Sequence, residues 1–329
     1  MKLEELREIR ACLPAGRSLF YYERDWFKVM LLEYLLEAGW TAPEIRRSEF
    51  ARLLERPDIR DLISKRGKLL LDSTDMLNLY QKKPVAWRLS LGSWGNKRNN
   101  RYHQITRRGF NLVLQINFPE QHNRCYRYYI NGKNRDYFNY SGHPASKQEL
   151  TMAWVRLDVD MEQGEVLIEE IQSDWVRQVA HYSHNLSWLH GRLVRDAAPN
   201  SRYSIRDCKQ TCKDFSNYAD KILPKYTKHW QETALAAAMF FSVHELGIRE
   251  IFMHDFETGN RLKHISSSYG LPPRSIYTRL PRKFCFQRSL RVPALAETPI
   301  AALQKGKRHS HKITEPRFWY LSFLETEQV

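Results

Sequence analysis

The chain has 329 residues with a formal net charge of +15, and 42% of its residues are hydrophobic. That hydrophobic content excludes global disorder, and the length suits one large or two ordinary domains. No run of about 18 apolar residues occurs and the first ten residues are highly charged, so we expect a soluble, cytoplasmic protein. The basic surplus favours nucleic acid as a partner, although basic charge can also serve solubility alone.

Residues 1–84 are predicted to be a helical N-terminal region. The stretch DWFKVMLLEYLLEA at 25–38 places apolar residues at helical spacing, and Gly39 ends it. Thr41 and Glu44 form a capping-box pattern that opens a second helix. Shorter helices are expected at 48–55, 57–65 and 73–81. Because no residue here suggests chemistry, we interpret the region as a cap or as a platform for a protein partner.

A strand with alternating apolar residues is expected at 85–91, followed by a loop at 92–109 that mixes cations with aromatic residues. Cations beside aromatic rings suit phosphate contact combined with base stacking, and a mobile solvated loop is the alternative. A second basic loop is predicted at 304–312. The predicted nucleic-acid-binding residues are Lys97, Arg98, Arg101, Arg107, Arg108, Lys305, Lys307 and Arg308.

Antiparallel strands are predicted in the next part of the chain. The first lies at 112–118, and a short tyrosine-rich strand at 126–130 ends in the turn signal Asn131-Gly132. Strand 151–159 then pairs with strand 165–172 across a polar turn that contains glycine. This last hairpin has the strongest local pattern.

The second strand of that hairpin ends in the polar run of VLIEEIQSDW, residues 166–175. An unpaired carboxylate in a buried strand costs several kcal/mol, so the polar end of the strand predicts a site. Glu170, Gln172 and Asp174 alternate and should share one side, with Glu169 on the other face. The alternative is a purely structural ion-pair network with nearby arginines.

Helices dominate the C-terminal third. We expect a helical insertion at about 175–228, an alanine-rich helix at 229–246 and a buried strand at 249–254. A further helix at 255–268, a strand that begins near Lys283 and a final strand complete the chain. These elements indicate an α+β fold, with residues 85–329 forming a core whose β–α–β crossover is right-handed.

This element order resembles the GNAT acyltransferase fold. In that family three antiparallel strands precede a splayed strand, a helix whose N-terminus holds the CoA pyrophosphate, another strand, a helix and a hairpin. The resemblance implies an N-acyltransferase that uses acetyl-CoA or another acyl-CoA, with Glu170 as proton acceptor and Tyr277 as proton donor. The family's glycine-bearing pyrophosphate loop is absent after Gln172, where the insertion stands.

The hairpin is also similar to PD-(D/E)xK nucleases, in which one strand carries an Asp and the next carries Glu-x-Lys. Asp158 or Asp160 with Glu170 and Gln172 imitates that spacing, and such carboxylates could hold Mg²⁺. The lysine of the nuclease motif is Gln172 here. A third alternative is a non-enzymatic nucleic-acid-binding accessory protein.

At the level of motifs, residues 150–285 resemble a domain of phage and mobile-element polyvalent proteins. The motifs are EIQSDW, Trp230-x-Glu232, Thr258-Gly259 and a Tyr-x-x-Leu-Pro that begins at Tyr277. This resemblance implies a phage, plasmid or defence context rather than a reaction. Val176-Arg177 replaces the His-Gln that usually follows the tryptophan.

These patterns define the candidate site. The predicted catalytic residues are Glu170, Gln172, Asp174, Glu232 and Tyr277. The predicted cofactor-binding residues are Trp230, Thr258 and Gly259. No metal site is assigned, and the sequence leaves open whether Cys208 and Cys212 bind metal together with His181, His184 and His190.

Overall fold

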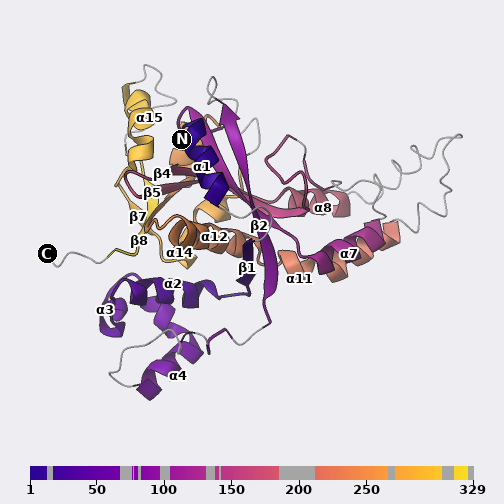
Figure 1. The fold of residues 1–329 in the computed structure, drawn as a ribbon, viewed down its shortest axis with the longest axis horizontal. Coiled ribbons are helices and arrows are strands. Elements are labelled where there is room, and N and C mark those ends of the chain that lie inside the picture. The colour runs from indigo at the N-terminus through magenta and orange to yellow at the C-terminus, as the bar shows by residue number, and fades with distance from the viewer. Residues whose placement is uncertain are drawn as a thin grey trace, which may run out of the picture.

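The computed structural model shows a mixed sheet that runs through the molecule, with helices packed on both faces (Figure 1). The residues that it describes are 1–12, 18–66, 76, 78–80, 83–96, 104–130, 138–140, 142–184, 212–265, 271–305 and 315–324. The predicted α+β class, a mixed sheet flanked by helices, is confirmed.

Within these residues the sheet has eight strands in the spatial order β1-β2-β3-β4-β5-β6-β8-β7. The strands are β1 (Ser18–Tyr22), β2 (Val85–Asn96), β3 (Gly109–Asn117), β4 (Thr151–Asp160), β5 (Glu165–Gln172), β6 (Glu250–His254), β7 (Gln287–Ser289) and β8 (Phe318–Ser322). All neighbours pair antiparallel except β5 and β6, which are parallel. The crossover between β5 and β6 therefore forms the expected β–α–β unit.

Helices cover the sheet and extend beyond two of its sides (Figure 1). The α-helices are α1 (Leu3–Cys12), α2 (Phe27–Glu37), α3 (Ala42–Arg47), α4 (Pro57–Arg66), α7 (Glu120–Ile130), α8 (Asp174–His184), α11 (Pro224–Thr227), α12 (Trp230–Phe240), α13 (Phe256–Leu262), α14 (Arg279–Lys283) and α15 (Ala294–Lys305). Figure 1 shows α2, α3 and α4 grouped below the sheet, and α7, α8 and α11 grouped at its right-hand end.

The two faces of the sheet belong to two hydrophobic clusters. The larger cluster contains α12, whose alanines are fully buried and let the helix approach the sheet closely. Alternate residues of β4, Ala153, Val155 and Leu157, face this cluster. The smaller cluster joins Leu167 of β5 to Leu295 of α15 on the opposite face. Because α12 is apolar on all sides, it is a buried helix of the core rather than a surface helix.

The strongest sequence patterns gave the right elements. The hairpin β4–β5, the helix α12 and the strand β6 all occur where they were expected. The helix α12 continues as a π-helical turn at Phe241–Glu245 and ends before Gly247, whose φ of +68° favours glycine.

The N-terminal region differs from the helical prediction because it also contributes a strand. The strand β1 pairs with β2 and forms one edge of the same sheet. In β1 the buried Phe20 and Tyr22 alternate with exposed neighbours, which is the period of two of a strand. The helical patterns before and after these five residues obscure that period in the sequence. The helix expected at 73–81 lies mostly outside the described residues.

Three further expectations were wrong. The tyrosine-rich stretch 126–130 belongs to the helix α7, because His122 and Tyr126 share a helical face that packs into an aromatic cluster. Residues 92–96 continue β2 rather than starting a loop, and Trp94 pairs with Asn111 of β3. The region near Lys283 is the end of the helix α14, and the strand β7 begins four residues later.

No helix among the described residues is long and apolar enough to cross a membrane.

Candidate functional site

A cleft of about 750 Å³ opens beside the end of β5. The parallel pairing joins Glu165–Ile168 to Glu250–Met253 and stops there, while β5 continues to Gln172. Side chains from β2, β4, β5, α8 and α12 line the space, together with described residues of the ranges 140–144, 263–265 and 271–277. The polar and aromatic lining residues are Trp94, Gln104, Tyr140, His143, Trp154, Arg156, Glu170, Gln172, Ser173, Arg177, Trp230, Gln231, Lys263 and Tyr277.

A β-bulge at Glu169 decides which side chains reach this cleft. Arg156 pairs with Glu170, but the next residue of β4 pairs with Ile168, so Glu169 is an extra residue. A bulge interrupts the alternation of side chains. Val166, Ile168 and Ile171 therefore all face the larger hydrophobic cluster, and Glu169 and Glu170 both face away from it. The expectation that the two glutamates lie on opposite faces was wrong for this reason.

Glu169 lies in a closed polar cluster below the cleft. Its carboxylate accepts hydrogen bonds from the backbone amide and hydroxyl of Thr106, at 2.9 and 2.8 Å, and His254 Nε2 lies 3.0 Å from Oε2. Lys263 Nζ donates to the carbonyl oxygen of Glu169 at 2.7 Å. The side chains of Glu169 and His254 are both fully buried.

The charges in this cluster compensate one another. Burial alone would raise the pKa of Glu169, but His254 and the Lys263 charge outweigh it and lower the pKa to about 2. Burial lowers the pKa of His254 and of Lys263, and the Glu169 carboxylate opposes this in both. At neutral pH Glu169 is therefore a carboxylate and His254 a neutral imidazole that donates to it.

Glu170 lies in the cleft but is engaged by an arginine. Its carboxylate forms an ion pair with Arg156, whose side chain is 1% exposed and whose NH2 also donates to the carbonyl of Gln104 at 2.9 Å. The ring of Trp94 lies 5.9 Å from the guanidinium. Because the Glu170 carboxylate is bound by the guanidinium of Arg156, it is a poor acceptor for a substrate proton.

The far end of the cleft contains a second carboxylate with a histidine. Asp174 Oδ1 lies 2.8 Å from His143 Nδ1, and Oδ2 accepts from Trp154 Nε1 at 3.0 Å. Gln172 and Arg177 each donate to Oδ1 at 2.7 Å. Burial would raise the pKa of Asp174, but these hydrogen bonds outweigh it and lower the pKa. Asp174 therefore stays ionised and holds the imidazole.

Most of the predicted catalytic residues do come together. Glu170, Gln172, Trp230 and Tyr277 line the cleft, and Asp174 supports its far end. The Tyr277 hydroxyl is buried and makes no hydrogen bond of normal geometry within the described residues. Burial raises its pKa well above the usual value, and the charge of Glu170 adds to this effect.

Glu232, Thr258 and Gly259 lie elsewhere. Glu232 accepts from Tyr22 at 2.6 Å and pairs with Lys283, so it ties α12 to the N-terminal region. Thr258 accepts from the backbone of Arg317, and a side chain at Gly259 would clash with His254. None of these three lines the cleft, because helical geometry turns them toward other elements.

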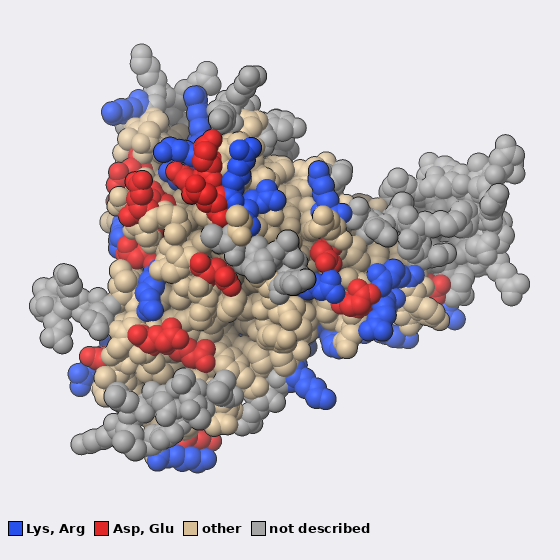
Figure 2. All heavy atoms as spheres, viewed as in Figure 1, with Lys and Arg blue, Asp and Glu red and all other residues tan. Residues whose placement is uncertain are grey.

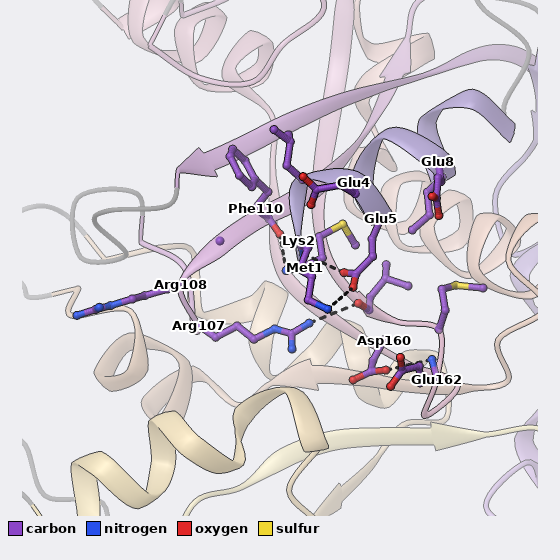
Figure 3. Close-up of a pocket in the computed structure, with 15 residues that line it drawn as sticks. Met1, Lys2, Glu4, Glu5, Glu8, Arg107, Arg108, Phe110, Asp160 and Glu162 are labelled. Carbon is purple, nitrogen blue, oxygen red and sulfur yellow. Dashed lines mark hydrogen bonds and ion pairs between the residues drawn. The ribbon is translucent and has the colours of Figure 1, made fainter.

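The nuclease spacing does not form a carboxylate pair. Glu170 pairs with Arg156, whereas Asp160 pairs with Glu165 at the opposite end of the hairpin. Asp158 is buried and is bound by Arg107, at 2.7 and 3.0 Å, and by the amine of Met1 at 3.1 Å. Met1, Arg107 and Asp160 line a separate cavity of about 740 Å³ beside α1, which carries several carboxylates (Figure 3).

The predicted basic residues are only partly described. Arg107 is engaged by Asp158, whereas Arg108, which also lines the cavity, is exposed (Figure 3). Lys305 is exposed at the end of α15. Lys97, Arg98, Arg101, Lys307 and Arg308 lie outside the described residues. On the face shown in Figure 2, described cations and carboxylates alternate without a continuous basic surface.

Three cleft residues were not identified as functional from the sequence. No role was predicted for His143, and no sequence pattern assigned a function to Lys263 or Arg156. The triplet Gly142-His143-Pro144 was a weak local signal, because proline restricts the backbone next to the histidine. Their proximity to the cleft depends on the packing of separate elements.

Among the described residues, no group of three or more His, Cys, Asp and Glu side chains could hold a metal ion. Of the residues considered for zinc, Cys208 and His190 lie outside them.

The chain matches no known family model, no curated protein and no solved structure. The resemblance of its motifs to the polyvalent-protein domain therefore stays a prediction.

Proposed function

We propose that the protein is an acyl-CoA-dependent N-acyltransferase. The observation that carries the proposal is the divergence of β5 from β6: they pair over Glu165–Ile168, then β5 runs on alone beside the cleft. Along the chain β5, the crossover helix α12, β6, the helix α13 and the antiparallel pair of β7 and β8 occur in an order similar to that of the GNAT fold, with α15 between β7 and β8. Because fold alone does not define activity, the proposal also depends on the side chains in the cleft.

The residues present fit an acyl-CoA. When bound, this group supplies a thioester whose acyl carbon accepts an amine. Its anionic part requires cations and helix N-terminal amides. A second hollow of about 430 Å³ lies at the N-terminus of α12 and shares Trp230 and Gln231 with the cleft. Lys228 and Arg279 line that hollow and are exposed.

The lining of the cleft also contains a group that can donate a proton to the leaving thiolate. The buried phenol of Tyr277 lies beside β5 in the lining of the cleft, with its hydroxyl next to the backbone of Ile171, so it can give a proton to a departing sulfur. Glu170 is engaged by Arg156, and its role is to fix that guanidinium in the wall of the cleft. These roles replace the proton transfer first assigned to Glu170.

We further propose an acceptor amine that is on, or close to, nucleic acid, in a cytoplasmic phage or mobile-element setting. The net charge of +15 and the EIQSDW-type motifs support this context. A filter-binding titration tests it, because affinity for a polyanion falls steeply with salt. Binding that is absent, or that does not change between 50 and 200 mM salt, would remove nucleic acid from the proposal.

Calorimetric titration with acetyl-CoA tests the function. We expect binding at micromolar to millimolar acetyl-CoA, and release of CoA thiol when a panel of primary amines is added. Arg279→Ala should weaken binding about tenfold, since one charge-assisted hydrogen bond contributes about 1.5–3 kcal/mol. Lys225→Ala, which removes an exposed cation of α11 outside both hollows, is the matched control. No binding at 5 mM acetyl-CoA would overturn the proposal, whatever the outcome with amines.

A further inference from the structure

The cleft contains a second carboxylate, Asp174, which differs from Glu170 in its partner. Glu170 is paired with the permanently charged Arg156, whereas Asp174 is paired with His143. An imidazole can accept and release a proton near neutral pH, which a guanidinium cannot do. The far end of the cleft is therefore better equipped for acid–base chemistry than the residue first chosen for it.

The geometry around His143 leaves one ring nitrogen available. Nδ1 lies 2.8 Å from Asp174 Oδ1, and Nε2 makes no hydrogen bond to any described residue. The side chain is a quarter exposed and lines the cleft. A base whose Nδ1 is held by a carboxylate presents Nε2 in a fixed direction, as proton transfer in a reaction requires.

The supports of this pair come from four separate parts of the chain. Asp174 stands at the N-terminus of α8 and is held by Trp154 of β4 and Gln172 of β5. The histidine's own backbone amide donates to the Tyr140 carbonyl at 2.9 Å, which closes the turn before β4. A pair fixed from so many sides has little freedom, which favours a role in positioning rather than in surface solvation.

We infer that His143 is the general base of the reaction and that Asp174 is its positioning residue. The inference rests on the proposed function. As the amine nitrogen bonds to the acyl carbon, one proton passes from that nitrogen to His143 Nε2. The carbon–sulfur bond breaks, and the sulfur leaves as a thiolate that takes a proton from Tyr277 or water. The amide is released, the imidazolium returns its proton to solvent, and a Tyr277 phenolate, where formed, takes a proton back from solvent.

The ring's tautomer gives a test that needs no acyl-CoA. The inference requires the neutral ring to carry its proton on Nδ1, directed at Asp174. Gln172 Nε2 also lies 2.9 Å from Nδ1, and if Nδ1 accepted from that amide the proton would be on Nε2 instead. Long-range ¹H–¹⁵N spectra of the full chain at pH 8 separate these states, with His143→Gln identifying the signal. A protonated Nε2 would overturn the inference.

Turnover gives the second test, with acetyl-CoA as the probe and the panel of primary amines as nucleophiles. We expect His143→Gln to lower the rate of CoA release about 100-fold or more, with KM for acetyl-CoA changed less than threefold. Asp174→Asn should lower it about tenfold and change the tautomer. Added imidazole should restore part of the rate to His143→Gly, an effect that a purely structural histidine would not show.

His184→Gln is the matched control, because His184 is exposed on α8 and does not line the cleft. Its rate should equal that of the wild type. If His143→Gln binds acetyl-CoA and releases CoA at the wild-type rate, the general base is another group and the inference fails while the proposed function stands. If the wild type binds no acetyl-CoA, the proposed function fails, and with it this role for His143, even where the tautomer is as expected.

Discussion

Two carboxylate–histidine pairs lie near the end of β5, one with Glu169 on the strand and one with Asp174 two residues beyond it, and they differ in exposure. In the closed pair, Glu169 and His254 are 3.0 Å apart and both side chains are 0% exposed. In the open pair, Asp174 and His143 are 2.8 Å apart and the imidazole is 25% exposed in the cleft. The separation and chemistry of the two pairs are nearly the same.

The comparison shows that solvent access, not residue type, separates a structural pair from a reactive one. The closed pair has no space for a substrate, and all of its polar contacts are internal, so its interactions contribute to stability. Both pairs have one imidazole nitrogen without a hydrogen-bond partner among the described residues, but Nδ1 of His254 is buried whereas the His143 ring is a quarter exposed in the cleft. The contribution of the open pair to stability should be small. The predictions below use the free energy of unfolding to separate the two pairs.

The largest effect is expected from Glu169→Ala. The change leaves His254 and Thr106 without the carboxylate that they bind and removes a negative charge near the buried ammonium of Lys263, so we expect a loss of about 3–5 kcal/mol in the free energy of unfolding. Urea denaturation followed by circular dichroism measures it. Glu162→Ala, on the exposed turn between β4 and β5, is the matched control. A loss below 1 kcal/mol would mean that the Glu169–His254 pair is not buried away from solvent.

Acidification should weaken the closed pair progressively. The His254 pKa lies below its unfolded value, so stability falls as pH drops below about 6.5. The Glu169 contribution is complete above about 4.5 and is lost as pH falls towards about 2. Each group adds a slope of at most about 1.4 kcal/mol per pH unit. Urea midpoints from pH 7 to 3 should therefore fall, and less steeply in His254→Gln; parallel curves would contradict this.

Lys263→Met should cost about 1–3 kcal/mol. The ammonium donates to the Glu169 carbonyl and lines the cleft, so it connects the closed cluster to the open site. The loss is moderated because the variant no longer buries a charge. We also expect weaker acetyl-CoA binding, measured by calorimetry, which Glu162→Ala should not show. Unchanged stability would indicate that the bulge is maintained without this contact.

His143→Gln should change the free energy of unfolding by about 1 kcal/mol or less. Asp174 keeps its hydrogen bonds from Trp154, Gln172 and Arg177 after the substitution, so no buried carboxylate is left unpaired. Thermal and urea unfolding measure this, beside the loss of turnover. A cost near that of Glu169→Ala would place His143 with the structural pair.

The smallest stability effect is expected from Tyr277→Phe. Its hydroxyl is buried without a hydrogen bond of normal geometry to any described residue, so removal should change stability by about 0.5 kcal/mol or less. CoA release should still fall about tenfold or more if the phenol protonates the leaving sulfur. Normal turnover in a stable variant would remove Tyr277 from the reaction.

Local sequence patterns were informative where one pattern extended over a whole element. The alternation in 151–172 and the alanine-rich run of 229–246 gave the hairpin β4–β5 and the helix α12 because period and capping act within a few residues. The candidate site could be placed at the end of β5 for the same reason. An abrupt change from apolar to acidic residues is visible without any tertiary information.

Packing decided the elements whose local signals conflicted. Aromatic residues at 126–130 favour a strand locally, but the aromatic cluster around His122 and Trp175 stabilises them as a helix. The strand β1 was not predicted, because its five residues are too few for the period of a strand to be distinguished from the helical patterns around them. Trp175, the last residue of VLIEEIQSDW, is fully buried in that cluster and does not line the cleft.

The sequence by itself determined the α+β class, the hairpin, the crossover helix and the location of a polar site at the end of VLIEEIQSDW. Only the tertiary structure decided which side chains share that site. A single bulge moved Glu169 to the same face as Glu170, and long-range packing brought His143 to Asp174 across 31 residues. Register shifts and contacts between distant segments depend on the free energy of the whole fold, which local periodicity does not contain.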